Sequence, residues 1–91
     1  ETPIEGACHV GLIFRFKRPK SHYRSNGLLK QSAPAYLIVK KNDLDKLVRS
    51  TLDALSGIAF IDDCQVTNLS ATKRYCNEDE VVGADILINE L

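Results

Sequence analysis

The chain has 91 residues, of which 44% are apolar and 26% charged, so it can bury one small core. No apolar run approaches the roughly 20 residues that span a bilayer, and no signal-peptide pattern opens the sequence. Cys8, Cys64 and Cys76 form no C-x-x-C pair, and their odd number favours a reducing compartment over a secreted, disulfide-stapled domain. We therefore expect residues 1–91 to form one soluble, cytoplasmic domain with no membrane partner.

The zero net charge conceals an uneven distribution of charged residues. Residues 15–41 contain eight basic residues and no acidic one, whereas residues 42–91 contain four basic and ten acidic residues. The chain thus divides into a basic arm and an acidic remainder, which the averaged charge does not reveal.

The first predicted element is a strand over residues 10–16, where apolar side chains alternate from Val10 to Phe16. Residues 20–35 follow as a long loop, because Asn26-Gly27 is a turn signal and Pro34 biases its neighbour away from a helix. A loop of this length in a small domain is uncommon unless it is functional or disordered. Residues 36–40 are predicted to be a short extended segment.

The clearest element is an amphipathic helix that starts after Asn42 or Asp43, either of which is a suitable N-cap. Its apolar residues recur at helical spacing from Leu44 to Leu55, and Gly57 is a suitable C-terminal cap. Asp45, Arg49 and Asp53 would form a polar stripe along it.

Two further strands are predicted over residues 65–75 and 82–88, joined as a hairpin across the polar turn at residues 77–80. The order of strand, long loop, helix, strand and strand predicts the α+β class. We expect a small, mostly antiparallel sheet with one main helix packed on it, and a long basic loop between the first strand and the helix.

Carboxylates are the first candidates for chemistry. Asp43 and Asp45 open the helix, and Asp62-Asp63 come one connection later. If they converge, their oxygens would suit Mg²⁺ or Mn²⁺, which can polarise a phosphate and activate a water for attack. Aspartates are also favoured in any first helical turn, because they cap free amides and oppose the helix dipole. Spacing alone leaves both interpretations open.

Arg49 follows Asp45 by one helical turn and precedes Asp53 by another. These residues suit a surface ladder of ion pairs, each worth a few tenths of a kcal/mol. Arg49 would otherwise stabilise charge that develops on a scissile phosphate.

The basic arm favours nucleic acid, because cations meet phosphates and an aromatic ring can stack on an unpaired base. A solvated lysine-rich loop is the alternative. The candidate DNA-binding residues are Lys17, Arg18, Lys20, His22, Tyr23, Arg24, Lys30, Lys40 and Lys41.

The run N-D-L-D-K-L-V-R-S-T-L-D-A-L-S-G-I-A-F-I-D-D-C-Q-V, residues 42–66, resembles the signature of the RusA family of Holliday junction resolvases. Matching parts are D-L-D at a helix start, a basic residue four positions after the second aspartate, D-A-L before a glycine, and D-D-x-Q-V. The segments R-P-K-S-H-Y and S-A-P-A-Y also look like parts of RusA-like proteins from phages and Gram-positive hosts.

The resemblance implies that Asp43, Asp45 and Asp63, rather than Asp62, are catalytic Mg²⁺ ligands, with Mn²⁺ possible. Arg49 would be the basic catalytic residue, where relatives often carry lysine. The resemblance further implies a homodimer that cuts four-way DNA junctions in recombination and repair, in a bacterial or phage-infected cell. RusA-like proteins have a strand, a loop and a helix before the strand at residues 10–16, and we expect this domain to lack them.

Three functional hypotheses follow from the sequence. The first is a Mg²⁺-dependent endonuclease for branched DNA. The second is a truncated RusA-like module that binds DNA without cutting it. The third is a structural or protein-binding domain, which would show no salt-dependent binding to DNA.

Overall fold

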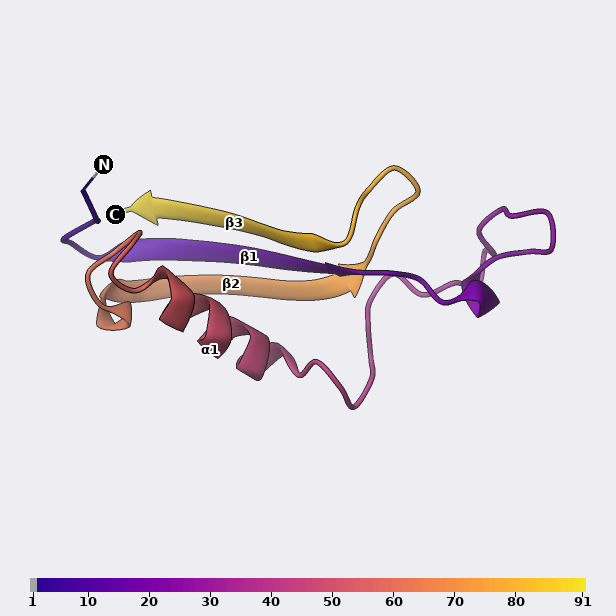
Figure 1. Ribbon diagram of the computed structural model, residues 1–91, viewed down its shortest axis with the longest axis horizontal. Helices are drawn as coiled ribbons and strands as arrows, with labels where there is room; N and C mark the ends of the chain where they lie inside the picture. The colour runs from indigo at the N-terminus through magenta and orange to yellow at the C-terminus, as the bar shows by residue number, and fades with distance from the viewer. Residues whose placement is uncertain (1) are drawn as a thin grey trace.

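The computed structural model describes residues 2–91 and contains three strands, one α-helix and two short 3₁₀ helices. In chain order the elements are β1 (Cys8–Phe16), η1 (Lys20–His22), α1 (Leu44–Leu55), η2 (Asp63–Gln65), β2 (Val66–Tyr75) and β3 (Gly83–Glu90). The predicted α+β class is confirmed, and so is the long basic loop between the first strand and the helix (Figure 1).

The sheet has the order β2-β1-β3 and is mixed, since β1 pairs parallel with β2 and antiparallel with β3. The predicted hairpin of the last two strands is therefore wrong, because β1 lies between them. Alternation of apolar residues predicts which face of a strand is buried but not which strand lies next to it. The connection from β1 through α1 returns the chain to the end of the sheet where β1 begins, so β2 runs parallel to β1.

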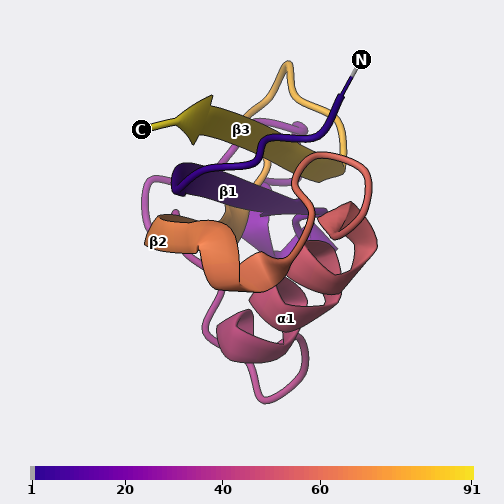
Figure 2. The same cartoon turned by 90° about the vertical axis from the view of Figure 1, so that its left-hand side faces the viewer.

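The core lies between the sheet and α1. Cys8, Val10, Leu12 and Phe14 alternate along β1 and are buried, as is Phe60 from the connection after α1. The apolar stripe of α1 packs against this cluster from the side of β2 (Figure 2). Gly57 has φ of +84°, a left-handed conformation that suits glycine, and ends the helix as predicted.

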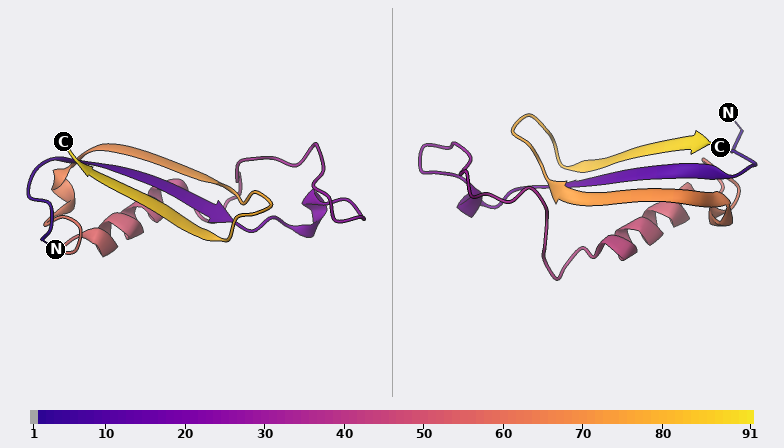
Figure 3. Two further views of the ribbon diagram at one scale, coloured as in Figure 1. Left: turned by 90° about the horizontal axis from the view of Figure 1, so that it is seen from above. Right: turned by 180° about the vertical axis from the view of Figure 1, so that it is seen from behind.

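The part of the basic arm that follows β1, residues 17–41, extends beyond the end of the sheet and gives the molecule its longest dimension of 52 Å (Figures 1 and 3). Within it, the predicted extended segment at residues 36–40 forms only an isolated bridge between Tyr36 and Arg74. Leu37 is nevertheless buried, so this part of the arm is packed against the sheet.

Arg18 fastens the arm to the end of the sheet. Its side chain is buried, with Nε donating to the Cys76 carbonyl at 2.9 Å and Nη1 donating to the Pro34 carbonyl at 2.7 Å. The guanidinium also lies over the Tyr75 ring, 5.3 Å from its centre. Two backbone hydrogen bonds join the same segments, from Tyr75 to Ala35 and from Cys76 to Phe16.

No helix among residues 2–91 is long and apolar enough to cross a membrane.

The turn between β2 and β3 is held by a forked ion pair. Arg74 donates to both carboxylate oxygens of Glu80, at 2.6 and 2.7 Å, and the Asn77 amide donates to the same side chain. The hydrogen bonds from Arg74 and then from Asn77 lower the pKa of Glu80 to about 2.

This pair predicts a pH dependence of stability. The lowered pKa means that the ionised Glu80 stabilises the fold fully above the ordinary glutamate pKa of about 4.3. That contribution is lost as pH falls towards about 2. In urea titrations, the stability difference between the parent and Glu80→Gln should be largest near pH 6 and should shrink towards pH 2. Glu78→Gln, in the same turn, is the matched control. A difference independent of pH would contradict the assignment.

Candidate active site and nucleic-acid interface

Asp43 and Asp45 lie at the start of α1, as the sequence predicts. Asp43 occupies the N-cap position, but its side chain accepts no hydrogen bond from the helix amides. Its carboxylate instead lies 3.8 Å from the ammonium group of Lys46, one turn along the helix. A capping hydrogen bond therefore does not account for Asp43, whereas its charge still opposes the helix dipole.

A hollow of about 460 Å³, here called the helix hollow, lies beside this helix start. It is lined by Lys40, Lys41, Asn42, Asp43, Lys46, Leu47 and Ser50. Three lysines and one carboxylate thus share a small concave surface, which favours an anionic ligand close to Asp43. Lys46 was not among the candidate residues predicted from the sequence. Its position three residues after Asp43 could have identified it as a neighbour of that carboxylate.

Asp63 lies in η2, whose geometry separates the roles of the two neighbouring aspartates. The Asp62 carboxylate accepts the Cys64 amide at 3.0 Å, and the Gln65 side-chain oxygen accepts the Asp62 amide at 2.8 Å, so that the two form a capping box. The Gln65 side-chain nitrogen donates to the carbonyls of Ile4 and Gly6, at 2.7 and 2.9 Å. Asp62 is thus engaged in holding η2 in place, and Asp63 follows it on the exposed surface.

The two aspartates differ in their affinity for a proton. Hydrogen bonds from the Cys64 amide and from Asp63 lower the pKa of Asp62. The hydrogen bond to Asp62, some loss of hydration and the charges of Asp62 and Asp53 raise the pKa of Asp63. Like charges placed close together disfavour a second ionisation, and a cation near Asp63 would relieve that repulsion.

The structure does not bring the predicted carboxylates together within one chain. Asp43 and Asp45 are at the start of α1, whereas η2 lies beyond its other end (Figures 1 and 3). A helix of the 12 residues printed for α1 is about 18 Å long at 1.5 Å per residue. Among residues 2–91, no group of three or more His, Cys, Asp and Glu side chains is placed to hold a metal ion. A single chain therefore does not fit a metal bound by all three aspartates.

Arg49 lies on the exposed side of α1, between these two ends. The ion pairs of residues 2–91 are Arg15 with Asp85, Lys46 with Asp43, and Arg74 with Glu80. The ladder of ion pairs from Asp45 through Arg49 to Asp53, one of the two interpretations of the stripe, is therefore not formed in this part of the chain.

The candidate DNA-binding residues of the arm separate into two groups. Arg18 is buried by its carbonyl partners, and His22 is half-buried with its ring edge-on to Tyr75 at 4.7 Å. These two residues hold the arm against the sheet. The exposed residues, which remain available to a phosphate or a base, are Lys17, Lys20, Tyr23, Arg24, Lys30, Lys40 and Lys41.

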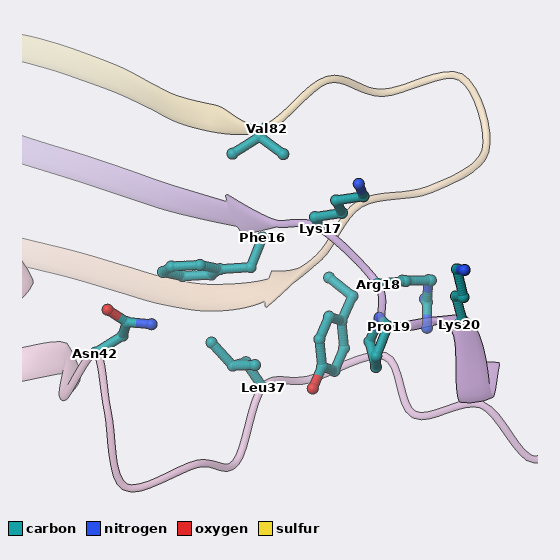
Figure 4. Close-up of a pocket in the computed structure, with 9 residues that line it drawn as sticks. Phe16, Lys17, Arg18, Pro19, Lys20, Leu37, Asn42 and Val82 are labelled. Carbon is teal, nitrogen blue, oxygen red and sulfur yellow. The ribbon is translucent and has the colours of Figure 1, made fainter.

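A second hollow of about 630 Å³, here called the end hollow, opens where β1 passes into the arm (Figure 4). It is lined by Phe16, Lys17, Arg18, Pro19, Lys20, Leu37, Asn42, Tyr75 and Val82. Asn42 lines both hollows, so they are neighbours on the surface. Its φ of +61° turns the chain between them, and the Lys73 ammonium donates to its carbonyl at 3.2 Å.

One family model, described as endodeoxyribonuclease RusA, matches residues 1–85. Comparison with curated proteins and with solved structures gave no match.

The arrangement of η2 predicts opposite effects of two neighbouring substitutions on stability. Asp63→Asn removes a carboxylate that the fold disfavours in its charged form, because the pKa of Asp63 is raised. Its free energy of unfolding at pH 7 should equal or exceed that of the parent. Asp62→Ala removes the acceptor of the Cys64 amide and should lower it. Urea denaturation at pH 7 measures both variants, and an Asp63→Asn variant less stable than Asp62→Ala would contradict the assignment.

Proposed function

The chain belongs to the RusA endodeoxyribonuclease family, and from this membership we propose that it resolves four-way DNA junctions by metal-dependent phosphodiester hydrolysis. Family members are hydrolases that act on DNA, and they generally depend on a divalent metal. The family match carries the proposal, because residues 1–85 include every candidate site residue. Recombination or repair of DNA in the cytoplasm is the corresponding setting.

A homodimer would reconcile the proposed metal site with the separation of the aspartates. If two copies pack with their α1 helices antiparallel about a twofold axis, the start of one helix lies beside the end of the other. Asp43 and Asp45 of one chain would then meet Asp63 of its partner, and the twofold axis would generate two such sites. The exposure of Asp45, Arg49 and Asp63 leaves this side of α1 free for a second copy.

The three aspartates supply hard oxygen donors, the ligand type that Mg²⁺ and Mn²⁺ prefer. A divalent ion bound there would polarise the scissile phosphate and lower the pKa of an attacking water. Arg49 projects from the middle of the same exposed side and would neutralise charge on the phosphate. Its guanidinium suits a forked contact with phosphate oxygens and stays protonated, so its role is binding rather than proton transfer.

The helix hollow supports the phosphate-binding part of the proposal. Lys40, Lys41 and Lys46 would hold the backbone of the cut strand against the start of α1, next to Asp43. The exposed cations of the arm would contact phosphates of an adjoining duplex, which makes binding depend on salt through the release of counterions.

A DNA-binding module without cleavage is the second candidate function. One observation favours it: within residues 2–91 of a single chain, no group of three or more His, Cys, Asp and Glu side chains is placed to hold a metal ion. The two candidates differ in one outcome, which is hydrolysis of a junction by the unmutated chain with Mg²⁺.

Cleavage of a labelled four-way junction in Mg²⁺ tests the proposal. The parent chain should nick the junction, and EDTA should stop it. Asp43→Asn and Asp63→Asn should each reduce the cleavage rate by more than about 100-fold, since even the loss of an outer-shell partner costs about 10- to 100-fold. Both variants should bind the junction with an affinity within a few-fold of the parent, because their substitutions remove no cation.

Asp79→Asn is the matched control, because Asp79 is an exposed aspartate in the turn between β2 and β3. It should cut at the parent rate. Salt-dependent binding by a parent chain that cuts no junction in Mg²⁺ or Mn²⁺ would instead establish the DNA-binding module.

A further inference from the structure

The end hollow has a fixed apolar floor that the proposed hydrolysis does not use. Leu37 and Tyr75, two of its lining residues, are only 7% and 8% exposed, and Phe16 is half-buried beside them. In Figure 4, Val82 lies above Phe16 and Leu37 lies below it. Because Arg18, His22 and two backbone hydrogen bonds hold this region together, the hollow exists before any ligand binds.

The rim of the end hollow is cationic. Lys17 and Lys20 are exposed and line it, and no acidic residue does. An apolar, partly aromatic floor beneath two ammonium groups is complementary to a ligand that has one flat apolar part and one anionic part. A nucleotide has both, since its base presents a π-face and its sugar carries a phosphate.

The position of the end hollow relates it to the proposed site of cleavage. Asn42 lines it together with the helix hollow, and Asp43, the next residue, lines the helix hollow. A strand whose phosphate lies among Lys40, Lys41 and Lys46 would therefore pass a neighbouring nucleotide across Asn42 towards the end hollow.

A paired base in a duplex cannot enter such a hollow, because its faces are covered by stacking. Extruding a base costs a few kcal/mol and costs least where it is already unstacked or unpaired. The branch point of a four-way junction interrupts the continuous stack of a duplex, so a base there should cost less to extrude than one within an arm.

We propose that the end hollow takes one unstacked nucleobase at the branch point of the DNA, with Lys17 and Lys20 on its phosphate. This inference rests on the proposed function, and it adds a device by which the chain distinguishes branched DNA from a continuous duplex.

The test measures how much one base contributes to binding. Dissociation constants are determined in Ca²⁺, which replaces Mg²⁺, for a four-way junction and for matched junctions that lack one base in turn at each nucleotide of the branch point. For the parent chain, removal of one particular base should weaken binding about 5- to 150-fold, the range expected for loss of one stacked base.

Substitutions in the end hollow should abolish this dependence on the base. Leu37→Gln makes the floor polar. For this variant, the dissociation constant of the junction that lacks the base should exceed that of the intact junction by less than about twofold. Val82→Gln alters the exposed rim, where folding is not at risk, and should give an intermediate ratio. Val81→Gln is the matched control, because Val81 is exposed in the same turn but does not line the hollow, and it should keep the parent ratio.

Each result has a distinct meaning. If the parent chain binds and cuts the junction but no base removal weakens binding, the nucleobase site is wrong and the proposed function stands. If Val82→Gln or Leu37→Gln instead converts a dimer to a monomer with an unchanged ratio, a second copy of the chain covers the hollow and the inference is overturned. If the parent chain binds neither the intact junction nor any junction that lacks a base, the proposed function and this inference both fail.

Discussion

The rigidity of α1 is the constraint on which the account of the site depends. A packed α-helix cannot bring its two ends together, and the 12 residues of α1 keep Asp43 about 18 Å from the end that η2 adjoins. The apolar face of the helix is committed to the core of the sheet, so the exposed face can meet only solvent, DNA or another chain. If the three carboxylates form one site, as proposed, two copies of the molecule must assemble it, and catalysis would then require dimerisation.

The second constraint is the anchoring of the basic arm. Without such an anchor, an arm of this charge would be a solvated loop. The buried Arg18 side chain provides the anchor, because it donates to two backbone carbonyls and lies over the Tyr75 ring. That anchor leaves the remaining cations exposed and shapes the end hollow between the arm and the sheet. The chain then turns at Asn42 into the helix hollow. The exposed cations at Lys40 and Lys41, the start of α1 and the end hollow are thus neighbours on the surface.

Much of this architecture could be predicted from residue patterns, because the patterns express local physics. The apolar spacing from Leu44 to Leu55 predicts α1 and Gly57 predicts its end, and the alternation from Val10 to Phe16 predicts β1. Strand order could not be predicted, since alternation of apolar residues does not specify which strands are neighbours. The expected hairpin of β2 and β3 is absent, because β1 lies between them.

In the arm, Arg18 could not be distinguished from Lys17 or Lys20 by charge alone, because its burial depends on carbonyls 16 and 58 residues away. The choice of Asp63 over Asp62 rests on family resemblance and stays a prediction; the structure shows that Asp62 takes part in a capping box.

The most direct test of the shared active site mixes two inactive chains. If each site combines Asp43 of one chain with Asp63 of its partner, every site in pure Asp43→Asn or pure Asp63→Asn protein carries one defect. A mixed dimer instead places both defects in one site and leaves the other intact. After subunit exchange, the mixture should recover nicking of a four-way junction in Mg²⁺, at one strand per dimer. A mixture as inactive as its separate components would contradict the shared site.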